Sequence, residues 1–256
     1  MATGRALPDL PPPTPLLPDH AHVGYDIGAI PSRLRNVLCR TFYVEFYERP
    51  APVESPERKS WNWPNLRSPQ SRAGQPTPNS ARIKIDFQDG PVERYYGISI
   101  EMVANPGSAN EPADLDFSRY TPGKMLVRPT QYPEASTRAA GAFQFAPQAL
   151  RRRVWQIVQS ITEVGLHHFD FSGRGELLRG SRDFVYQVLM YFMISRILDP
   201  VITNIWPIEL RQHTWRLLPD VMGKRFSDGK FNEHPIRRGR FRIYQRRTPN
   251  PSQYEP

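Results

Sequence analysis

The sequence contains a single cysteine, Cys39, among its 256 residues. An intramolecular disulfide is therefore excluded, as is a metal site built from paired cysteines. The most apolar stretch, residues 183–195, is too short to cross a membrane and is flanked by Arg182 and Arg196. No apolar leader of the secretory type is visible at the N-terminus. We expect an intracellular protein, in the cytoplasm or the nucleus, with no membrane span.

The chain also lacks the motifs that identify common cofactor and metal sites. It has no phosphate-binding loop and no His-Glu-x-x-His pair. The glycines of residues 173–180 are spaced G-x-G-x-x-x-x-G, which does not match the dinucleotide-binding spacing. His20 and His22 have no third metal ligand near them in the sequence. We therefore predict neither a metal nor a cofactor.

Proline, in contrast, is abundant and concentrated. Of the 28 prolines, seven lie in residues 1–31 and seven in residues 50–78, and such stretches disfavour a packed core. We expect one folded domain with a floppy N-terminus and not two domains. The predicted divisions are a disordered tail at 1–32, a single α+β domain at 33–241 with long loops at 48–79 and 104–122, and a basic tail at 242–256.

The periodicity of apolar residues predicts the fold class. Strands are expected at residues 38–47, 81–87, 94–102, 124–127 and 166–171. Helices are expected at residues 147–163, 181–200 and 208–218. This order of elements is typical of an α+β protein, so we predict a small antiparallel sheet packed by two to three helices.

Isolated polar residues on the predicted strands give no catalytic pattern. We expect the carboxylates of Glu45, Asp86 and Glu101 to be exposed, and we predict no acid/base pair among them because their separation does not follow from the sequence. We interpret Cys39 as a buried free cysteine that packs as a small apolar residue, with a reactive thiol as the alternative.

The helix predicted to begin at Ser181 is the most apolar segment of the chain. Apolar residues surround most of its circumference, which indicates a central, buried helix. Serine is a common N-cap, but a helix start is also where papain-like enzymes hold their nucleophile. Ser181 is therefore a cap or a nucleophile, with His167 or His168 as its base. Adjacent strand residues point to opposite faces, so only one of these histidines would serve.

Residues 169–184 read F-D-F-S-G-R-G, followed after four residues by G-S-R-D-F. This pattern resembles the hallmark of an uncharacterised family of fungal proteins, in which a short strand and a glycine turn precede Gly-Cys-Arg-x-Trp at the start of a long apolar helix. The segment Arg238-Gly239-Arg240-Phe241 is similar to that family's Gly-x-Phe ending. The likeness spans residues 38–241.

The layout of that family is similar to permuted papain-like domains of the lecithin:retinol acyltransferase type. In those domains a histidine on an early strand precedes a cysteine at a helix start. Here Ser181 stands at the cysteine position, and the first strand offers only Thr41 and Tyr43 in place of the histidine. The resemblance therefore implies a catalytically degenerate scaffold that binds a small molecule or a partner protein. The residues implied for binding are Thr41, Tyr43, Arg182 and Phe184.

The resemblance also implies an accessory role in fungal secondary-metabolite biosynthesis. Two alternatives stay open beside it. The first is an acyl-transfer or cyclisation enzyme that uses Ser181 as its nucleophile. The second is nucleic-acid binding, because the net charge is +9 and basic residues are concentrated near the C-terminus, interleaved with aromatic rings. The candidate nucleic-acid contacts are Arg237, Arg238, Arg240, Arg242, Tyr244, Arg246 and Arg247.

Overall fold

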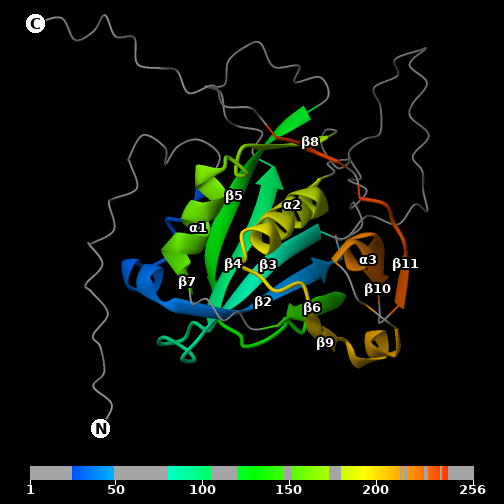
Figure 1. Cartoon of the computed structure of the whole chain (residues 1–256), viewed down its shortest axis with the longest axis horizontal. Helices are drawn as coiled ribbons and strands as arrows, with labels where there is room; N and C mark the ends of the chain where they lie inside the picture. Colours follow the sequence, from blue (N-terminus) through cyan, green and yellow to red (C-terminus); the bar gives the residue numbers. More distant parts are fainter. Residues whose placement is uncertain are drawn as a thin grey trace, which may run out of the picture.

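The computed structural model describes residues 25–48, 80–104, 120–146, 152–172, 180–213, 215, 218–227, 230–236 and 238–241. In these ranges the chain forms a large, mostly antiparallel sheet with helices on one of its faces (Figure 1). The sheet follows the strand order β12-β8-β5-β4-β3-β2-β6-β9, with β1 parallel to β5 and β7 beside β2. A mixed α/β fold with an antiparallel sheet packed by helices was predicted, and this part of the prediction is confirmed. The sheet was predicted to be small, which is wrong, because it has ten strands.

The bounds of the elements are as follows. The strands of the large sheet are β1 Tyr25–Asp26, β2 Leu38–Tyr47, β3 Ser80–Phe87, β4 Gly97–Ala104, β5 Tyr120–Thr130, β6 Gly141–Phe145, β7 Arg152–Arg153, β8 Phe169–Ser172, β9 Ile202–Trp206 and β12 Arg240–Phe241. A separate hairpin pairs β10 Lys224–Ser227 with β11 Lys230–Glu233. The helices are α1 Val154–Glu163, α2 Ser181–Ile194 and α3 Leu218–Met222, and two 3-10 helices are η2 Ser32–Asn36 and η4 Ile208–Gln212.

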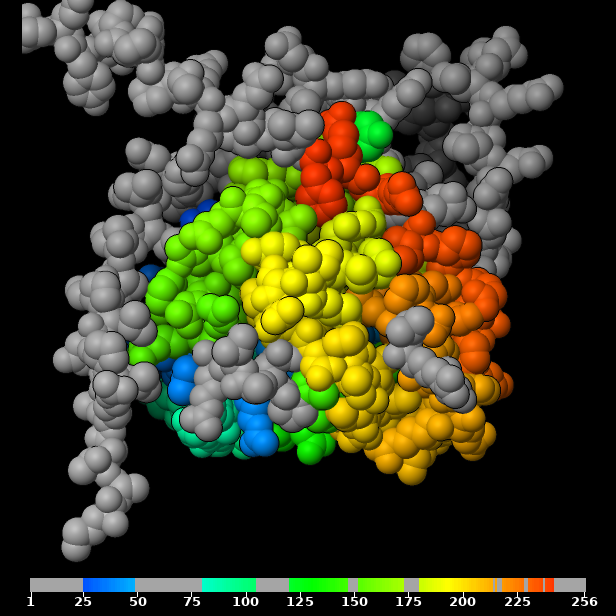
Figure 2. All heavy atoms as spheres, in the orientation of Figure 1, coloured from blue at the N-terminus to red at the C-terminus, as the bar shows by residue number. Residues whose placement is uncertain are grey.

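The inner face of the sheet is apolar and packs against α2. Strand β2 turns Phe42, Val44 and Phe46 to this face, and its neighbour β3 adds Ile83 and Ile85, all of them buried. Helix α2 contacts β3 and β4 at the centre of the sheet. In the space-filling view, α1, α2 and the segment around α3 and β10 lie side by side over this face (Figure 2). The predicted central helix therefore exists and is buried along most of its length.

Helix α2 is shorter than predicted, because it ends at Ile194 and not at Pro200. The backbone N–H groups of Ile197 and Leu198 both donate to the carbonyl of Phe192, at 2.7 and 3.1 Å. Arg196 adopts a left-handed conformation with φ 56°, which turns the chain out of the helix. Ile197 and Leu198 thereby enter the core, where they are buried. Burial of these two aliphatic side chains is favourable, which accounts for the end of α2 at Ile194. The prediction relied on Pro200 and so placed the end too late.

Several other predicted boundaries differ from the structure. Residues 25–32 were assigned to the disordered tail, but β1 and η2 begin there and Tyr25 and Ile30 belong to the core. The prediction of disorder was based on the high proline content of this stretch, and it overlooked these two apolar residues. The predicted helix at 208–218 is instead η4 followed by α3, and β6 and β9 to β12 were not predicted. The rest of the tail at 1–24, most of both long loops, and residues 242–256 lie outside the described ranges.

An aromatic cluster closes the end of the core between β2, β6 and β10. The ring of Phe143 lies 6.0 Å from that of Phe46, 5.3 Å from that of Phe226 and 5.4 Å from that of Trp215, measured between ring centroids. Gly141 leaves room for this arrangement, since a Cβ there would lie 2.8 Å from the Phe226 ring.

Every helix in the described ranges falls short of the length and apolarity that a membrane crossing requires.

Truncation of Phe143 tests the importance of this cluster. We expect Phe143→Ala to lower the free energy of unfolding by about 3–5 kcal/mol, because it removes a fully buried ring and leaves a cavity. Urea denaturation followed by tryptophan fluorescence measures the change. Ile194→Ala is the matched control, since that side chain is 77% exposed and its loss should alter stability by no more than about 0.5 kcal/mol. Equal effects of the two variants would contradict this view of the core.

Candidate functional site

The start of α2 was predicted to hold Ser181 as an N-cap or a nucleophile. The N-cap is Gly180, which has φ 131°, and Ser181 is the first helical residue. A φ of this value favours glycine, which explains why the cap has no side-chain oxygen. Ser181 is buried, as are the next two residues of the helix, Arg182 and Asp183. Ser181 is therefore not the N-cap, and the capping position was predicted one residue too late in the chain.

The space in front of this helix start is filled by protein. The ring of Phe169 packs so closely that a Cβ added to Gly180 would lie 2.9 Å from it. A Cβ added to Gly239 would lie 2.0 Å from the same ring and 2.6 Å from the carbonyl oxygen of Asp170. The N–H of Gly239 donates to the carboxylate of Asp183 at 2.8 Å. The end of the described chain, red in Figure 2, therefore packs against the start of α2.

Arg182 is a structural anchor within this junction. Its guanidinium donates hydrogen bonds to four backbone carbonyls, at distances between 2.6 and 3.3 Å. Burial disfavours the charged guanidinium and lowers the pKa of Arg182 to about 10. The bonds tie α2 to the end of α3, to the start of β10 and to the segment that follows β11. The acceptors belong to Met222, Lys224, His234 and Pro235.

The predicted catalytic histidines lie in the connection between α1 and β8. Their ring centroids are 3.8 Å apart, and the His167 ring meets that of Tyr25 edge to face at 5.3 Å. Both side chains are buried. The structure thus places the histidines against β1 and against each other.

The residues predicted for binding fall on two sides of the sheet. Phe184 lies on α2, at the inner face, with its ring centroid 5.9 Å from that of Phe169. Thr41 and Tyr43 belong to the opposite face, because they alternate with inward-facing Phe42 on β2. Arg182 serves the junction described above. The four residues do not form one pocket.

The predicted nucleic-acid segment is only partly described. Arg240 makes an ion pair with Asp170 at 2.9 Å, and its guanidinium carbon lies 4.1 Å from the centroid of the Tyr120 ring. This side chain therefore holds β12 to its neighbours, whereas Arg238 is exposed. The other members of the set lie outside the described residues: Arg237, Arg242, Tyr244, Arg246 and Arg247.

The outer face of the sheet carries a buried polar network that sequence reasoning did not find. Glu45, expected to be exposed, is completely buried. Its carboxylate accepts bonds from Arg82 Nε at 2.8 Å and from the hydroxyls of Tyr47 and Tyr132 at 2.7 and 3.1 Å. It also accepts the backbone N–H of Ser136 at 2.7 Å. Four donors on one carboxylate compensate its removal from water.

Lys84 and Asp86 form a second ion pair beside Glu45. Lys84 is completely buried, and its Nζ lies 4.8 Å from the Tyr43 ring centroid and 4.9 Å from that of Tyr132. Asp86 also accepts the N–H of Glu134 at 3.1 Å. Desolvation disfavours both charges, so burial lowers the pKa of Lys84 and raises that of Asp86, although their mutual attraction opposes both shifts.

These bonds fix the loop 131–140 over the outer face of the sheet. Residues Tyr132, Glu134 and Ser136 each bond to a strand carboxylate, Glu45 or Asp86. One feature of the sequence indicates this arrangement. The outward-facing residues of β2 are Tyr-Glu-Tyr and those of β3 are Arg-Lys-Asp, and their charges are complementary. The sequence did not show that the loop 131–140 covers these residues and thereby buries them. Cys39, also on β2, is buried as expected, and desolvation raises its pKa.

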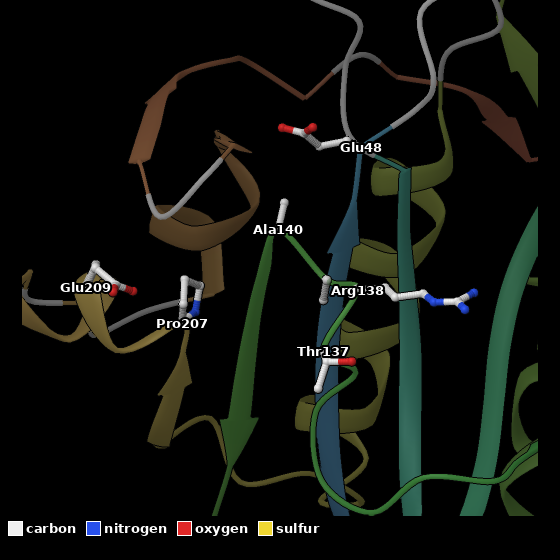
Figure 3. Close-up of a pocket in the computed structure, with 7 residues that line it drawn as sticks. Glu48, Thr137, Arg138, Ala140, Pro207 and Glu209 are labelled. Atoms are coloured by element: carbon white, nitrogen blue, oxygen red, sulfur yellow. The ribbon is translucent and has the colours of Figure 1, made fainter.

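The second half of this loop forms one wall of an open hollow with a volume of about 520 Å³. Figure 3 shows Thr137 and Ala140 on one side and Pro207 and Glu209 on the other, with Glu48 at the end of β2 above them. The hollow is wide and polar. Within the described ranges, no group of three or more His, Cys, Asp or Glu side chains is arranged to hold a metal ion.

Comparison with known proteins gives no relative: no protein-family model, no curated protein and no solved structure matches this chain.

A double-mutant cycle tests how the outer-face ion pair contributes to stability. We expect Lys84→Met to cost about 3–5 kcal/mol of unfolding free energy, because it leaves the Asp86 carboxylate without its buried counter-ion. Lys84→Met combined with Asp86→Leu removes both charges and should be more stable than Lys84→Met alone. Chemical denaturation at neutral pH measures the cycle. A double variant that is as unstable as the sum of the two single changes would show that the charges do not act as a pair.

Proposed function

We propose that this protein is a non-catalytic binding protein built on a degenerate, permuted papain-like scaffold. It would bind a small molecule or a partner protein. An accessory role in fungal secondary-metabolite biosynthesis and an intracellular location belong to the same proposal and derive from the resemblance of residues 38–241.

The observation that carries this proposal is the closed packing at the start of α2. A papain-like enzyme needs substrate access to the nucleophile at the helix start and a base within hydrogen-bond reach of it. Here Phe169 and Gly239 fill the space in front of the helix, and the Ser181 side chain is buried. Of the predicted bases, His167 packs against Tyr25, and His168 packs against His167. These features suit a structural junction better than a reaction centre.

The placement of α2 supports the papain-like part of the proposal. In the layout that residues 38–241 resemble, a histidine lies on an early strand and a cysteine stands at the start of a helix. Helix α2 packs centrally on β3 and β4, and its start adjoins β8 through Phe169.

The hollow beside the loop 131–140 is the binding region that we propose. Its volume falls within the range of small-molecule sites, and it is open to solvent. Glu48 and Glu209 supply carboxylates at its rim, whereas the guanidinium of Arg138 points away from the hollow (Figure 3). These groups offer polar contacts to an incoming ligand without a nucleophile among them.

A serine-reactive fluorophosphonate probe tests whether the scaffold is catalytic. We expect no labelling of the full-length protein, because the Ser181 side chain is buried in a closed junction. Labelling is measured by in-gel fluorescence and intact mass, with a known serine hydrolase as the positive control.

The matched variant is Ser181→Ala. It should have the same probe signal as the wild-type protein and a stability within about 1 kcal/mol of it, since the change removes one hydroxyl from a residue that is not the N-cap. Clear labelling of the wild-type chain that disappears in Ser181→Ala would overturn the proposal in favour of acyl transfer through Ser181.

A further inference from the structure

Arginine accounts for most of the basic residues of this chain, and six arginines gather where β2 begins. Of 34 basic residues, 29 are arginines and five are lysines. The six come from η2, from the start of β2 (residues 38–40), from the connection between β3 and β4 (residues 88–96) and from β7. These elements meet at the lower left of Figure 1. We call this region the arginine surface, and its arginines are Arg33, Arg35, Arg40, Arg94, Arg152 and Arg153.

Backbone hydrogen bonds hold these four elements together. Strand β7 pairs with the first two residues of β2, which places Arg152 opposite Cys39. The N–H of Gln88 donates to the carbonyl of Leu38 at 2.8 Å and fixes the β3–β4 connection beside the start of β2. The residue that follows η2 accepts the N–H of Val154 through its carbonyl, at 3.0 Å. The positive charges are therefore brought together by the fold, because the four elements are far apart in the sequence.

The arginine surface has an excess of positive charge. The same four elements carry two carboxylates, Asp89 and Glu93, so their net charge is +4. Glu93 pairs with Arg33 at 2.5 Å, and the two side chains are 50% and 58% exposed. An ion pair this exposed contributes little to stability, so another anion is able to replace the carboxylate. Three further arginines of the surface are exposed and make no ion pair among the described residues: Arg40, Arg94 and Arg153.

Two arginines of the surface hold hydrogen-bond donors that the protein leaves unused. The Nε atoms of Arg35 and Arg152 are buried and have no acceptor in the part of the chain that the structure describes, although each side chain as a whole is half-buried. Buried polar groups in proteins are nearly always hydrogen-bonded, so an unused donor favours an acceptor from outside the chain. The Nε–H and one Nη–H of an arginine form a fork that matches two oxygens of a phosphate. The arginine surface is thus suited to oxyanions.

We propose that the arginine surface binds the sugar-phosphate backbone of a nucleic acid. Six arginines on four elements spread positive charge over an extended surface, which suits a row of phosphates better than a single anion. Arginine also makes bidentate contacts with phosphate that lysine does not make. Because contacts with phosphate carry no sequence information, we expect binding without a preference for particular bases.

Aromatic side chains on and beside the same elements favour a nucleic acid over other polyanions. The guanidinium carbon of Arg94 lies 5.2 Å from the ring centroid of Tyr95, and Tyr95 and Tyr96 are both half-buried. Trp155, two residues after β7, is also half-buried. Aromatic rings next to phosphate-binding charges allow bases to stack. An anionic membrane is met by exposed apolar side chains beside the positive charge, but the large ones among the described residues lie on other elements: Val164, Ile194, Val201 and Ile208.

Fluorescence anisotropy with the full-length chain tests the proposal. The probe is a fluorescein-labelled single-stranded oligonucleotide of mixed sequence. For the wild-type protein we expect an affinity that falls steeply between about 50 and 200 mM salt. The test variant combines Arg40→Gln, Arg94→Gln and Arg153→Gln. It should bind at least about tenfold more weakly at about 100 mM salt, and its slope of log affinity against log salt should be shallower by about two, because three phosphate contacts are lost.

Two matched variants remove the same charge from other places. The first changes exposed arginines elsewhere on the fold, and the second changes the C-terminal segment that the sequence offered as a nucleic-acid contact. Both should keep most of the affinity, and circular dichroism checks that all three variants fold. An equal loss in either matched variant, or a wild-type protein without salt-dependent binding, would overturn the proposal. The substitutions are Arg128→Gln, Arg196→Gln and Arg211→Gln in the first variant and Arg242→Gln, Arg246→Gln and Arg247→Gln in the second.

Ultraviolet cross-linking of the wild-type protein to the same oligonucleotide locates the contact without any variant. We expect the cross-linked peptides to contain residues 88–96 or 152–155, where the aromatic rings of the arginine surface lie. Cross-links confined to other segments would contradict the proposal. Tighter binding of polyglutamate or of phosphatidylserine vesicles than of the oligonucleotide, compared at equal anionic charge, would overturn it in favour of an acidic protein or a membrane.

This inference goes beyond the proposed function, because the arginine surface shares no residue with the start of α2 or with the hollow of Figure 3. The fluorophosphonate and oligonucleotide experiments use different residues and different probes. Failure of one leaves the other standing.

Discussion

Packing of α2 against the centre of the sheet is the constraint on which the rest of the structure depends. A single helix that is apolar around most of its circumference needs a broad apolar surface, and β3 and β4 supply it. Successive residues of a strand point to opposite faces of the sheet. For every side chain that belongs to this apolar surface, the next residue along the strand therefore points to the outer face. The inner face thus determines which residues, including Glu45 and Lys84, lie on the opposite side of the sheet.

In the part of the chain that the structure describes, the outer face is covered by charged side chains, tyrosines and the loop 131–140, and not by a second layer of helices. Charged and tyrosine side chains there bury one another beneath a short loop, and each carboxylate gathers several donors. Buried ion pairs of this kind contribute little net stability when compared with apolar packing, but they strongly penalise any arrangement that leaves one partner alone. The network therefore selects one position of the loop 131–140, and this loop in turn shapes the hollow.

The local sequence at the start of α2 resembles a nucleophile site, but its residues have structural roles. A small residue at a helix start, a preceding glycine and an arginine next in sequence resemble the surroundings of a nucleophile. In three dimensions each neighbour has a structural role, since Gly180 allows close approach of Phe169, Arg182 binds four carbonyls, and Asp183 receives Gly239. A pattern that indicates chemistry along the chain here indicates the docking of the C-terminal segment.

The sequence by itself determined the alternating strands β2, β3 and β4, the central helix, the mixed α/β class and the burial of Cys39. These depend on periodicity and on local composition, which neighbouring residues carry along the chain. Only the tertiary structure decided where α2 ends, how residues 25–32 join the core, and that Glu45 is buried. Each of these depends on a contact that local patterns do not carry, because Leu198 finds its place in the core, Tyr25 meets Met125, and Glu45 meets Ser136. Burial of a charge is a property of what covers it, and the loop that covers Glu45 begins more than eighty residues later in the chain.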